Sequence, residues 1–245
     1  MAPPRDIPPD DPAEHGPAEH GPDAPTPGPD NDRLGLRRMT PAQQLRAGRL
    51  PRRLVQLFVG LSIFGLSMAM LIQAGRGMIP WDVLHYGLAQ HLPLSFGTIV
   101  IVVALAVLLL WIPLREMPGV GTLSNAIWVG IAADFSLSVL PAPEDLPWQM
   151  LLMTGGIVLN AAATAMYIGA QLGPGPRDGL MTGLARISPL SLRVIRTGLE
   201  VVVVLIGWLL GGVVGVGTVL FALSIGPLTQ FFLPPMVVRL PHPPR

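Results

Sequence analysis

Long runs of apolar residues without any charge are the feature that most constrains this chain. A helix needs about 20 apolar residues to cross the roughly 30 Å hydrocarbon core of a bilayer, and residues 54–75 and 92–114 each form such a run. The whole chain is 50% hydrophobic and only 13% charged, which leaves too few polar side chains to cover a soluble globule. The sequence therefore predicts an all-α fold, a polytopic membrane helix bundle, with the lipid bilayer as its surroundings.

About six membrane spans follow from the positions of these runs. The run 201–238 is longer than one crossing but too short for two crossings and a turn. If the turn lies at Gly211 and Gly212, the fifth helix must begin near Leu190, which draws charged residues into the membrane. The predicted spans are 54–75, 92–114, 117–140, 146–170, 190–211 and 214–233.

An internal repeat supports the same register. Shifting the chain by 96 positions aligns residues 57–135 with residues 153–231 without a gap, and it places Asp82 on Asp178. Glycines, prolines and serines match at this single offset, and the tetrapeptide GVGT occurs in both copies. Shared apolar composition does not produce matches of these residue types, so we infer that the membrane region is duplicated.

The duplication and the arginines together predict a topology. Each copy contains three spans, and this odd number makes the second copy enter the bilayer from the opposite side, as an inverted repeat. Arginines from Arg52 and Arg53 to Arg239 flank the spans on one face, so both termini are expected to be cytoplasmic in a bacterial inner membrane. The predicted parts are a disordered, Pro-rich and acidic tail, a first repeat and a second repeat, at residues 1–50, 51–140 and 146–235.

Composition argues against several classes of function. The net charge is +1, and the arginines do not form one basic face, so no nucleic-acid partner is expected. The chain has no cysteine, which excludes disulfides, thiolate metal sites and a cysteine nucleophile. It also shows no nucleotide-binding glycine loop, zinc signature or nucleophile elbow. We therefore expect no catalytic residue, metal or cofactor, and a chain that is not an enzyme.

A short amphipathic segment follows a Gly/Pro break between the first two spans of each copy. About twelve residues follow the breaks GMIP and GPGP, too few to cross a membrane. Pro80 and Pro176 suit the first helical position, which puts Asp82 and Asp178 in the first turn. In one interpretation each Asp only stabilises the N-terminus of an interfacial helix. In the other, both helices are re-entrant and bring two carboxylates to a central cavity that binds a cation, a proton or a polar solute.

Charged residues on the fifth predicted span form a second candidate site. Arg196 and Glu200 lie four residues apart and therefore on one helix face. Inside a membrane such a pair is either a structural ion pair or part of a solute or proton site, whereas Arg193, one turn earlier, can extend to the lipid phosphates. With Arg177, which precedes Asp178, these residues complete the candidate substrate-binding set of Asp82, Asp178, Arg177, Arg196 and Glu200.

Three stretches carry a resemblance to a known family. GMIPWDVLHYGLA, LGPGPRDGLMTGLA and GGVVGVGTVLFALSIGPLTQFF resemble the bacterial YczE/YyaS/YitT family of integral membrane proteins, over about residues 53–233. The chain stops shortly after Leu233, so it is more similar to the membrane-only, YczE-like form than to members with a soluble C-terminal domain. The resemblance implies a multi-helix bacterial membrane protein, and it carries over no assigned catalytic residue.

Two functions fit these observations. The first is a secondary transporter or channel-like carrier of a small solute or ion, favoured by the inverted repeats and by the embedded charges. The second is a membrane scaffold or regulatory protein that acts through a partner, favoured by the lack of any catalytic signature. Co-purification of a stoichiometric partner, unaffected by mutation of Asp82 and Asp178, distinguishes the second from the first.

Overall fold

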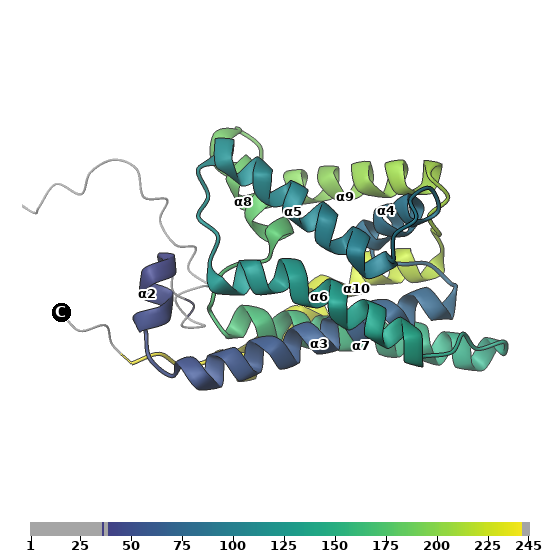
Figure 1. The fold of residues 1–245 in the computed structure, drawn as a ribbon, viewed down its shortest axis with the longest axis horizontal. Helices are drawn as coiled ribbons and strands as arrows, with labels where there is room; N and C mark the ends of the chain where they lie inside the picture. Colours follow the sequence, from purple (N-terminus) through teal and green to yellow (C-terminus); the bar gives the residue numbers. More distant parts are fainter. Residues whose placement is uncertain (1–35, 37–38, 242–245) are drawn as a thin grey trace, which may run out of the picture.

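The computed structural model describes residues 36 and 39–241, and no strand occurs in this part of the chain (Figure 1). The helices in chain order are α2 (Pro41–Arg46), α3 (Leu50–Ala74), α4 (Pro80–Ala89), α5 (Phe96–Leu114), α6 (Val120–Val139), α7 (Leu146–Gly169), α8 (Pro176–Ile187), α9 (Leu192–Leu209) and α10 (Val216–Met236). The repeat therefore pairs α3 with α7, α4 with α8, α5 with α9 and α6 with α10.

Five helices of the described part, namely α3, α5, α6, α7 and α10, are long and apolar enough to cross a membrane. Helix α9 is the remaining predicted span, and its 18 residues include Arg193, Arg196 and Glu200. Helices α4 and α8, of 10 and 12 residues, are too short to cross and follow the two Gly/Pro breaks. The predicted polytopic helix bundle is thus confirmed.

Helix α2 lies within residues 1–50, which the sequence assigns to a disordered tail. The described residues of this region begin at Leu36 and continue from Met39, and the prediction for the rest of the tail lies outside them. Thr40 caps α2, because its side chain accepts a hydrogen bond from Gln43 N while the Gln43 side chain accepts one from Thr40 N. Residues just before the first span are therefore helical.

The guanidinium of Arg53 ties three segments together. Helix α3 begins before the predicted span, and Arg53 is completely buried in it. Its Nε donates to the carbonyl of Ala170 at 2.8 Å, Nη1 to that of Gln44 at 2.5 Å and Nη2 to that of Gln171 at 2.6 Å. The sequence placed Arg53 in the basic flank of the span, whereas here its donors are used inside the protein.

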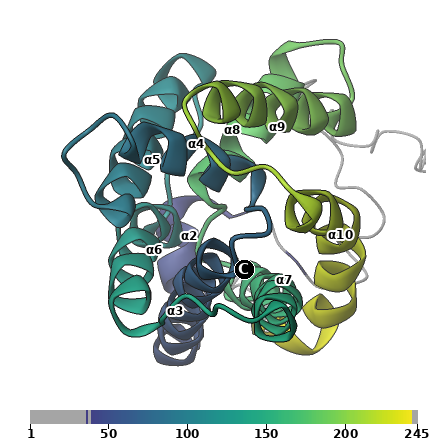
Figure 2. The ribbon, with the colours of Figure 1, turned by 90° about the vertical axis from the view of Figure 1, so that its right-hand side faces the viewer.

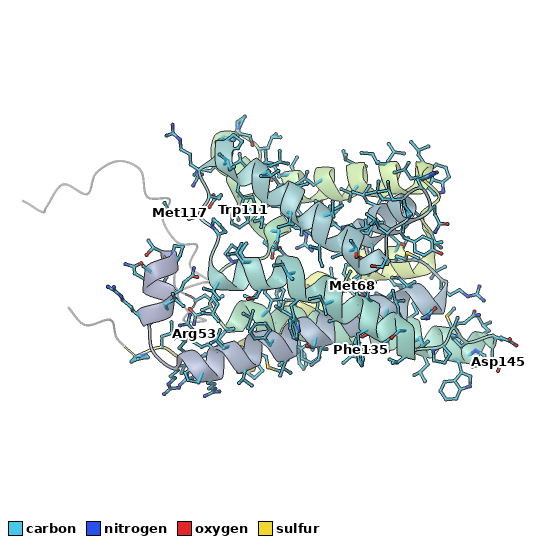
Figure 3. The ribbon with its side chains drawn as sticks, in the orientation of Figure 1. Arg53, Met68, Trp111, Met117, Phe135 and Asp145 are labelled. Atoms are coloured by element: carbon cyan, nitrogen blue, oxygen red, sulfur yellow. The ribbon has the colours of Figure 1, made fainter. Side chains whose placement is uncertain are left out.

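Helices α3 and α7 pack antiparallel along the molecule. Arg53, near the start of α3, binds residues that follow α7, and at the other end Gln73 of α3 donates to the carbonyl of Leu140, shortly before α7. Figure 3 shows Arg53 and Asp145, which precede the two helices' apolar parts, at opposite ends. Seen end-on in Figure 2, α6 lies beside α3, and α10 lies beside α7. The other four helices, α4, α5, α8 and α9, lie together in the upper part of this view.

Each broken segment docks on the other copy. The amide of Gly217, at the start of α10, donates to the carbonyl of Arg76 at 2.8 Å, and the amide of Gly121, at the start of α6, donates to the carbonyl of Leu172 at 2.7 Å. The two hydrogen bonds are equivalent under the 96-residue shift. The same crossing places α4 against α9 and α8 against α5. The copies therefore exchange their short helices and form one interlocked unit.

Glycine is required twice at this crossing. Gly77 and Gly173 have φ of 118° and 119°, which residues with a side chain rarely adopt. A Cβ at Gly77 would lie 2.7 Å from Thr218 N, and one at Gly173 would lie 2.8 Å from Thr122 Oγ1. The breaks seen in the sequence thus allow two backbones to meet.

In one of these contacts the glycine lies on the short helix, and in the other it lies on the long helix. The indole of Trp111 on α5 lies over Gly179 of α8, where an added Cβ would be 2.0 Å from it. At the equivalent contact in the other copy, Gly207 of α9 lies against Val83 of α4, with the large residue on the opposite side. Each contact therefore has one glycine and one larger residue, so both interfaces close at short range.

The crossing is expected to depend on the threonine hydroxyls. Thr122 Oγ1 is buried, accepts from Gly119 N and donates to the carbonyl of Pro174 at 2.7 Å. We expect Thr122→Val to reduce the free energy of unfolding by about 2 kcal/mol, because two buried polar groups lose their partner. Thr154→Val, on an exposed hydroxyl that bonds only its own helix, is the control and should change it by less than about 0.5 kcal/mol. Equal melting temperatures of the two variants in detergent would contradict this.

Candidate functional site

A cavity of about 130 Å³ lies where the two copies meet. Its wall receives side chains from every helix between α3 and α10, and α4 and α8 both begin at its edge, with Pro80 and Pro176 in the wall. Two helix N-termini therefore lie at one space, each with the positive end of its helix dipole.

Most of the wall of the cavity is built from pairs of residues that are 96 positions apart. In each of five pairs one member is polar and the other apolar: Phe64 with Asn160, Trp81 with Arg177, Val100 with Arg196, Ala104 with Glu200, and Asn125 with Phe221. Except in the last pair, the second copy supplies the polar member. The cavity is thus formed by both copies but carries its charges on one side.

Asp82 lies buried behind this wall and does not line the cavity. Its Oδ1 is 3.2 Å from His85 Nδ1 and 3.9 Å from an Nη of Arg177, and its Oδ2 has no hydrogen-bond partner in the described part of the chain. Burial lowers the pKa of His85 below its usual value, and the hydrogen bond to Asp82 opposes this to a lesser extent. When the ring carries a proton on Nδ1, it donates this hydrogen bond to the carboxylate.

Arg177 and Asp178 line the cavity from the first turn of α8. The guanidinium carbon of Arg177 lies 5.1 Å from the centre of the Trp81 ring, within the range of a cation–π contact. Asp178 accepts a 2.6 Å hydrogen bond from the hydroxyl of Tyr167 on α7. Trp81 is 6% exposed and its Nε1 has no partner among the described residues, so a buried donor remains available beside the cavity.

Arg196 and Glu200 form the predicted pair on one face of α9. Arg196 Nε donates to Glu200 Oε1 at 3.0 Å, both residues line the cavity, and their side chains are 48% and 25% exposed. The pair is thus reachable from the cavity and from outside the helix bundle. Arg193, one turn earlier, is exposed and does not line the cavity.

The structure gathers the five candidate residues around one point. Arg177, Asp178, Arg196 and Glu200 line the cavity, and Asp82 contacts it only through Arg177. Within the described part of the chain, the hydrogen bonds of the two aspartates go to the side chains of His85 and Tyr167.

Sequence reasoning missed the partners of both aspartates. Tyr167 bonds Asp178 from the end of α7, and no residue pattern indicates this approach. His85 lies three residues after Asp82, a spacing that places two residues on one helix face. This spacing could have predicted their contact from the sequence. Trp81 and Trp111 are also buried at the site, and Trp111 Nε1 donates to the carbonyl of Pro176 at 3.0 Å.

Among the described residues, no group of three or more His, Cys, Asp and Glu side chains is placed to hold a metal ion. The cavity instead offers guanidinium and carboxylate groups, an indole donor and two helix N-termini. Groups of these kinds can form hydrogen bonds and ion pairs with a small polar molecule.

Comparisons with known proteins agree with a membrane protein. The family model described as a family of unknown function, DUF6198, matches residues 51–234. The chain is 43% identical to an uncharacterized protein of Haemophilus influenzae over 188 residues, which cover 77% of this chain and 86% of that protein.

Two relatives come from Bacillus subtilis. The uncharacterized membrane protein YczE is 32% identical over 185 residues, covering 75% of this chain and 86% of YczE. The uncharacterized protein YyaS is 26% identical over 180 residues, covering 72% of this chain and 90% of YyaS. No solved structure matches the chain. The resemblance to YczE and YyaS is confirmed, and the chain belongs to the family of unknown function DUF6198, a YczE-like family of bacterial membrane proteins.

Proposed function

We propose that this protein is a secondary carrier that binds a small polar solute in the central cavity. The observation that carries the proposal is the cavity itself, which lies between the two copies and is lined by charged groups of both signs. Intramembrane charges are costly unless they are paired or functional. No catalytic step is assigned to any of these residues.

The charges favour a solute that carries a positive and a negative group. Three carboxylates, those of Asp82, Asp178 and Glu200, surround the two guanidiniums of Arg177 and Arg196. The guanidiniums and the helix N-termini attract an anionic group. The excess carboxylate is balanced by the cationic group of the solute, or by a proton or cation that moves with it.

An inverted repeat gives this cavity a route for transport. In the proposal the copies are related by an axis in the membrane plane, which the antiparallel packing of α3 on α7 and the reciprocal docking of the broken segments support. Rocking of one part of the bundle against the other would open the cavity to each side in turn. The arginine distribution orients both termini toward the cytoplasm of a bacterial inner membrane.

Replacing Arg177 is expected to reduce uptake strongly. Wild-type proteoliposomes should accumulate at least one solute from a panel of radiolabelled amino acids, betaines and phosphocholine. Arg177→Gln should reduce that uptake by at least about tenfold, the effect of losing about 1.4 kcal/mol of binding free energy, since no other guanidinium lines the cavity from α8. Arg193→Gln removes an equal charge outside the cavity and is the matched control.

Two results would contradict the carrier. The first is a folded wild-type protein that moves none of these solutes and no protons. The second is equal uptake by Arg177→Gln and Arg193→Gln, which would place the solute elsewhere. Stoichiometric co-purification of another protein together with the first result would favour the scaffold function instead.

A further inference from the structure

An apolar groove of about 760 Å³ separates α9 from α10. These two helices have almost no backbone contact, although α5 and α6, their equivalents in the first copy, pack tightly together. The groove is lined by one face of each helix, with the apolar residues Val201, Val204 and Leu205 on α9 and Val219, Ala222 and Leu223 on α10.

Replacement of one glycine explains why only the second copy is open. In the first copy Gly97 and Gly130 bring α5 and α6 into backbone contact, and Asp134 Oδ1 accepts from Gly97 N at 2.6 Å. The equivalent of Gly97 is Arg193, whose side chain prevents this approach. The equivalent of Gly130 is Gly226, where an added Cβ would meet nothing within 4 Å.

The groove lies directly beside the central cavity. Pro80 and Glu200 line both spaces, so the wall between them is a single layer of side chains. Along α9 the groove runs from Thr197 to Trp208, roughly 16 Å at 1.5 Å per residue. This is close to the roughly 15 Å depth of one leaflet of the hydrocarbon core. The polar end of the groove therefore lies at the cavity. The length of its apolar part matches that of one lipid tail.

We propose that the α9–α10 groove is a lateral entrance that holds the hydrocarbon tail of a single-tailed amphiphile, whose zwitterionic head lies at Arg196 and Glu200. This inference rests on the proposed function, and it makes the polar solute at the cavity the head group of a larger amphiphile. The apolar walls accept a tail, and the neighbouring guanidinium and carboxylate complement a head with both charges. A helix of a second copy in this groove would cover the exposed part of that ion pair. An amphiphile would instead bind the exposed part with its head.

The occupant can be tested with lysophosphatidylcholine that carries a diazirine in its tail. The full chain is reconstituted in phospholipid nanodiscs and irradiated with this probe, and adducts are located by peptide mass spectrometry. We expect adducts to concentrate on the groove faces of α9 and α10. Ala222→Trp fills the groove at an exposed position and should reduce these adducts about fivefold, equivalent to about 1 kcal/mol. Ile127→Trp, at the neighbouring exposed position of α6 in the other copy, should not change them.

The head is tested separately from the tail. The double variant Arg196→Gln, Glu200→Gln should lower groove adducts of the lysophosphatidylcholine probe severalfold but leave those of a diazirine-bearing fatty alcohol unchanged. Equal labelling of the groove and the outer face of α6, or no effect of Ala222→Trp, would overturn the inference, as would cross-links between two copies through the groove. Groove labelling without uptake of any solute or of the probe would refute the carrier and leave the binding site intact.

Discussion

Arg53→Ala is expected to reduce the free energy of unfolding by about 4 kcal/mol, the largest effect of a single polar substitution in this protein. The change removes a buried guanidinium and the three hydrogen bonds that it donates to the carbonyls of Gln44, Ala170 and Gln171. Each unsatisfied buried group costs about 1–3 kcal/mol. The loss should appear as a lower melting temperature in detergent or nanodiscs.

Two neighbouring substitutions make this result specific. Arg52→Ala removes an exposed arginine from the same turn of α3 and should leave the melting temperature nearly unchanged. Arg53→Lys keeps the charge, but one ammonium cannot reproduce the geometry of three planar donors, so most of the loss should remain. A melting temperature of Arg53→Ala equal to that of Arg52→Ala would show that the buried hydrogen bonds contribute nothing.

Exchanging the two residues of one interface tests whether the two copies use the same contact with the glycine and the larger residue in reversed places. Trp111→Gly is expected to destabilise the protein by about 4 kcal/mol through the cavity it leaves. Gly179→Val should destabilise it by about 3 kcal/mol, because a Cβ there would lie 2.0 Å from the indole. The double variant reproduces the residues of the Gly207–Val83 contact, so the two losses should be less than additive by about 2 kcal/mol.

Exposed positions provide the controls for this cycle. Trp208→Gly on α9 loses little buried area and should cost only about 1 kcal/mol, the effect of glycine in a helix. Gly198→Val, where a Cβ meets nothing within 4 Å, should be nearly neutral. Recovery in the double variant remains incomplete because the hydrogen bond from Trp111 Nε1 to Pro176 is lost. Fully additive losses would mean that the two contacts are not equivalent.

Most helix positions were predictable because lipid imposes a simple requirement on sequence. The spans predicted at 146–170 and 214–233 correspond to Leu146–Gly169 and Val216–Met236. The turn at Gly211 is also present, with φ of 91°. Helix α3 begins at Leu50, before the predicted span at 54–75, whose start was set after the last charged residue. Inside a protein, backbone carbonyls can satisfy a guanidinium as well as lipid phosphates do, and no local pattern shows that they will.

The candidate site was predictable as a list of residues but not as a geometry. The repeat marked Asp82 and Asp178 as equivalent, yet one is buried against His85 and Arg177 while the other faces the cavity and Tyr167. Their surroundings differ because the cavity pairs an apolar residue of one copy with a polar residue of the other. A constant sequence offset shows that two residues hold equivalent positions in the two copies. Contacts between the copies decide whether their surroundings are also the same.

The amino-acid sequence by itself determined that this chain is a helical membrane protein, since uncharged apolar runs need lipid. A constant offset of glycines, prolines and aspartates also indicated two similar halves. Only the tertiary structure decided that the copies exchange their short helices, bury Arg53, close one helix pair and leave the other open. These outcomes depend on which side chains meet across distances of about a hundred residues along the chain, and hydropathy and periodicity describe only neighbours within one helix.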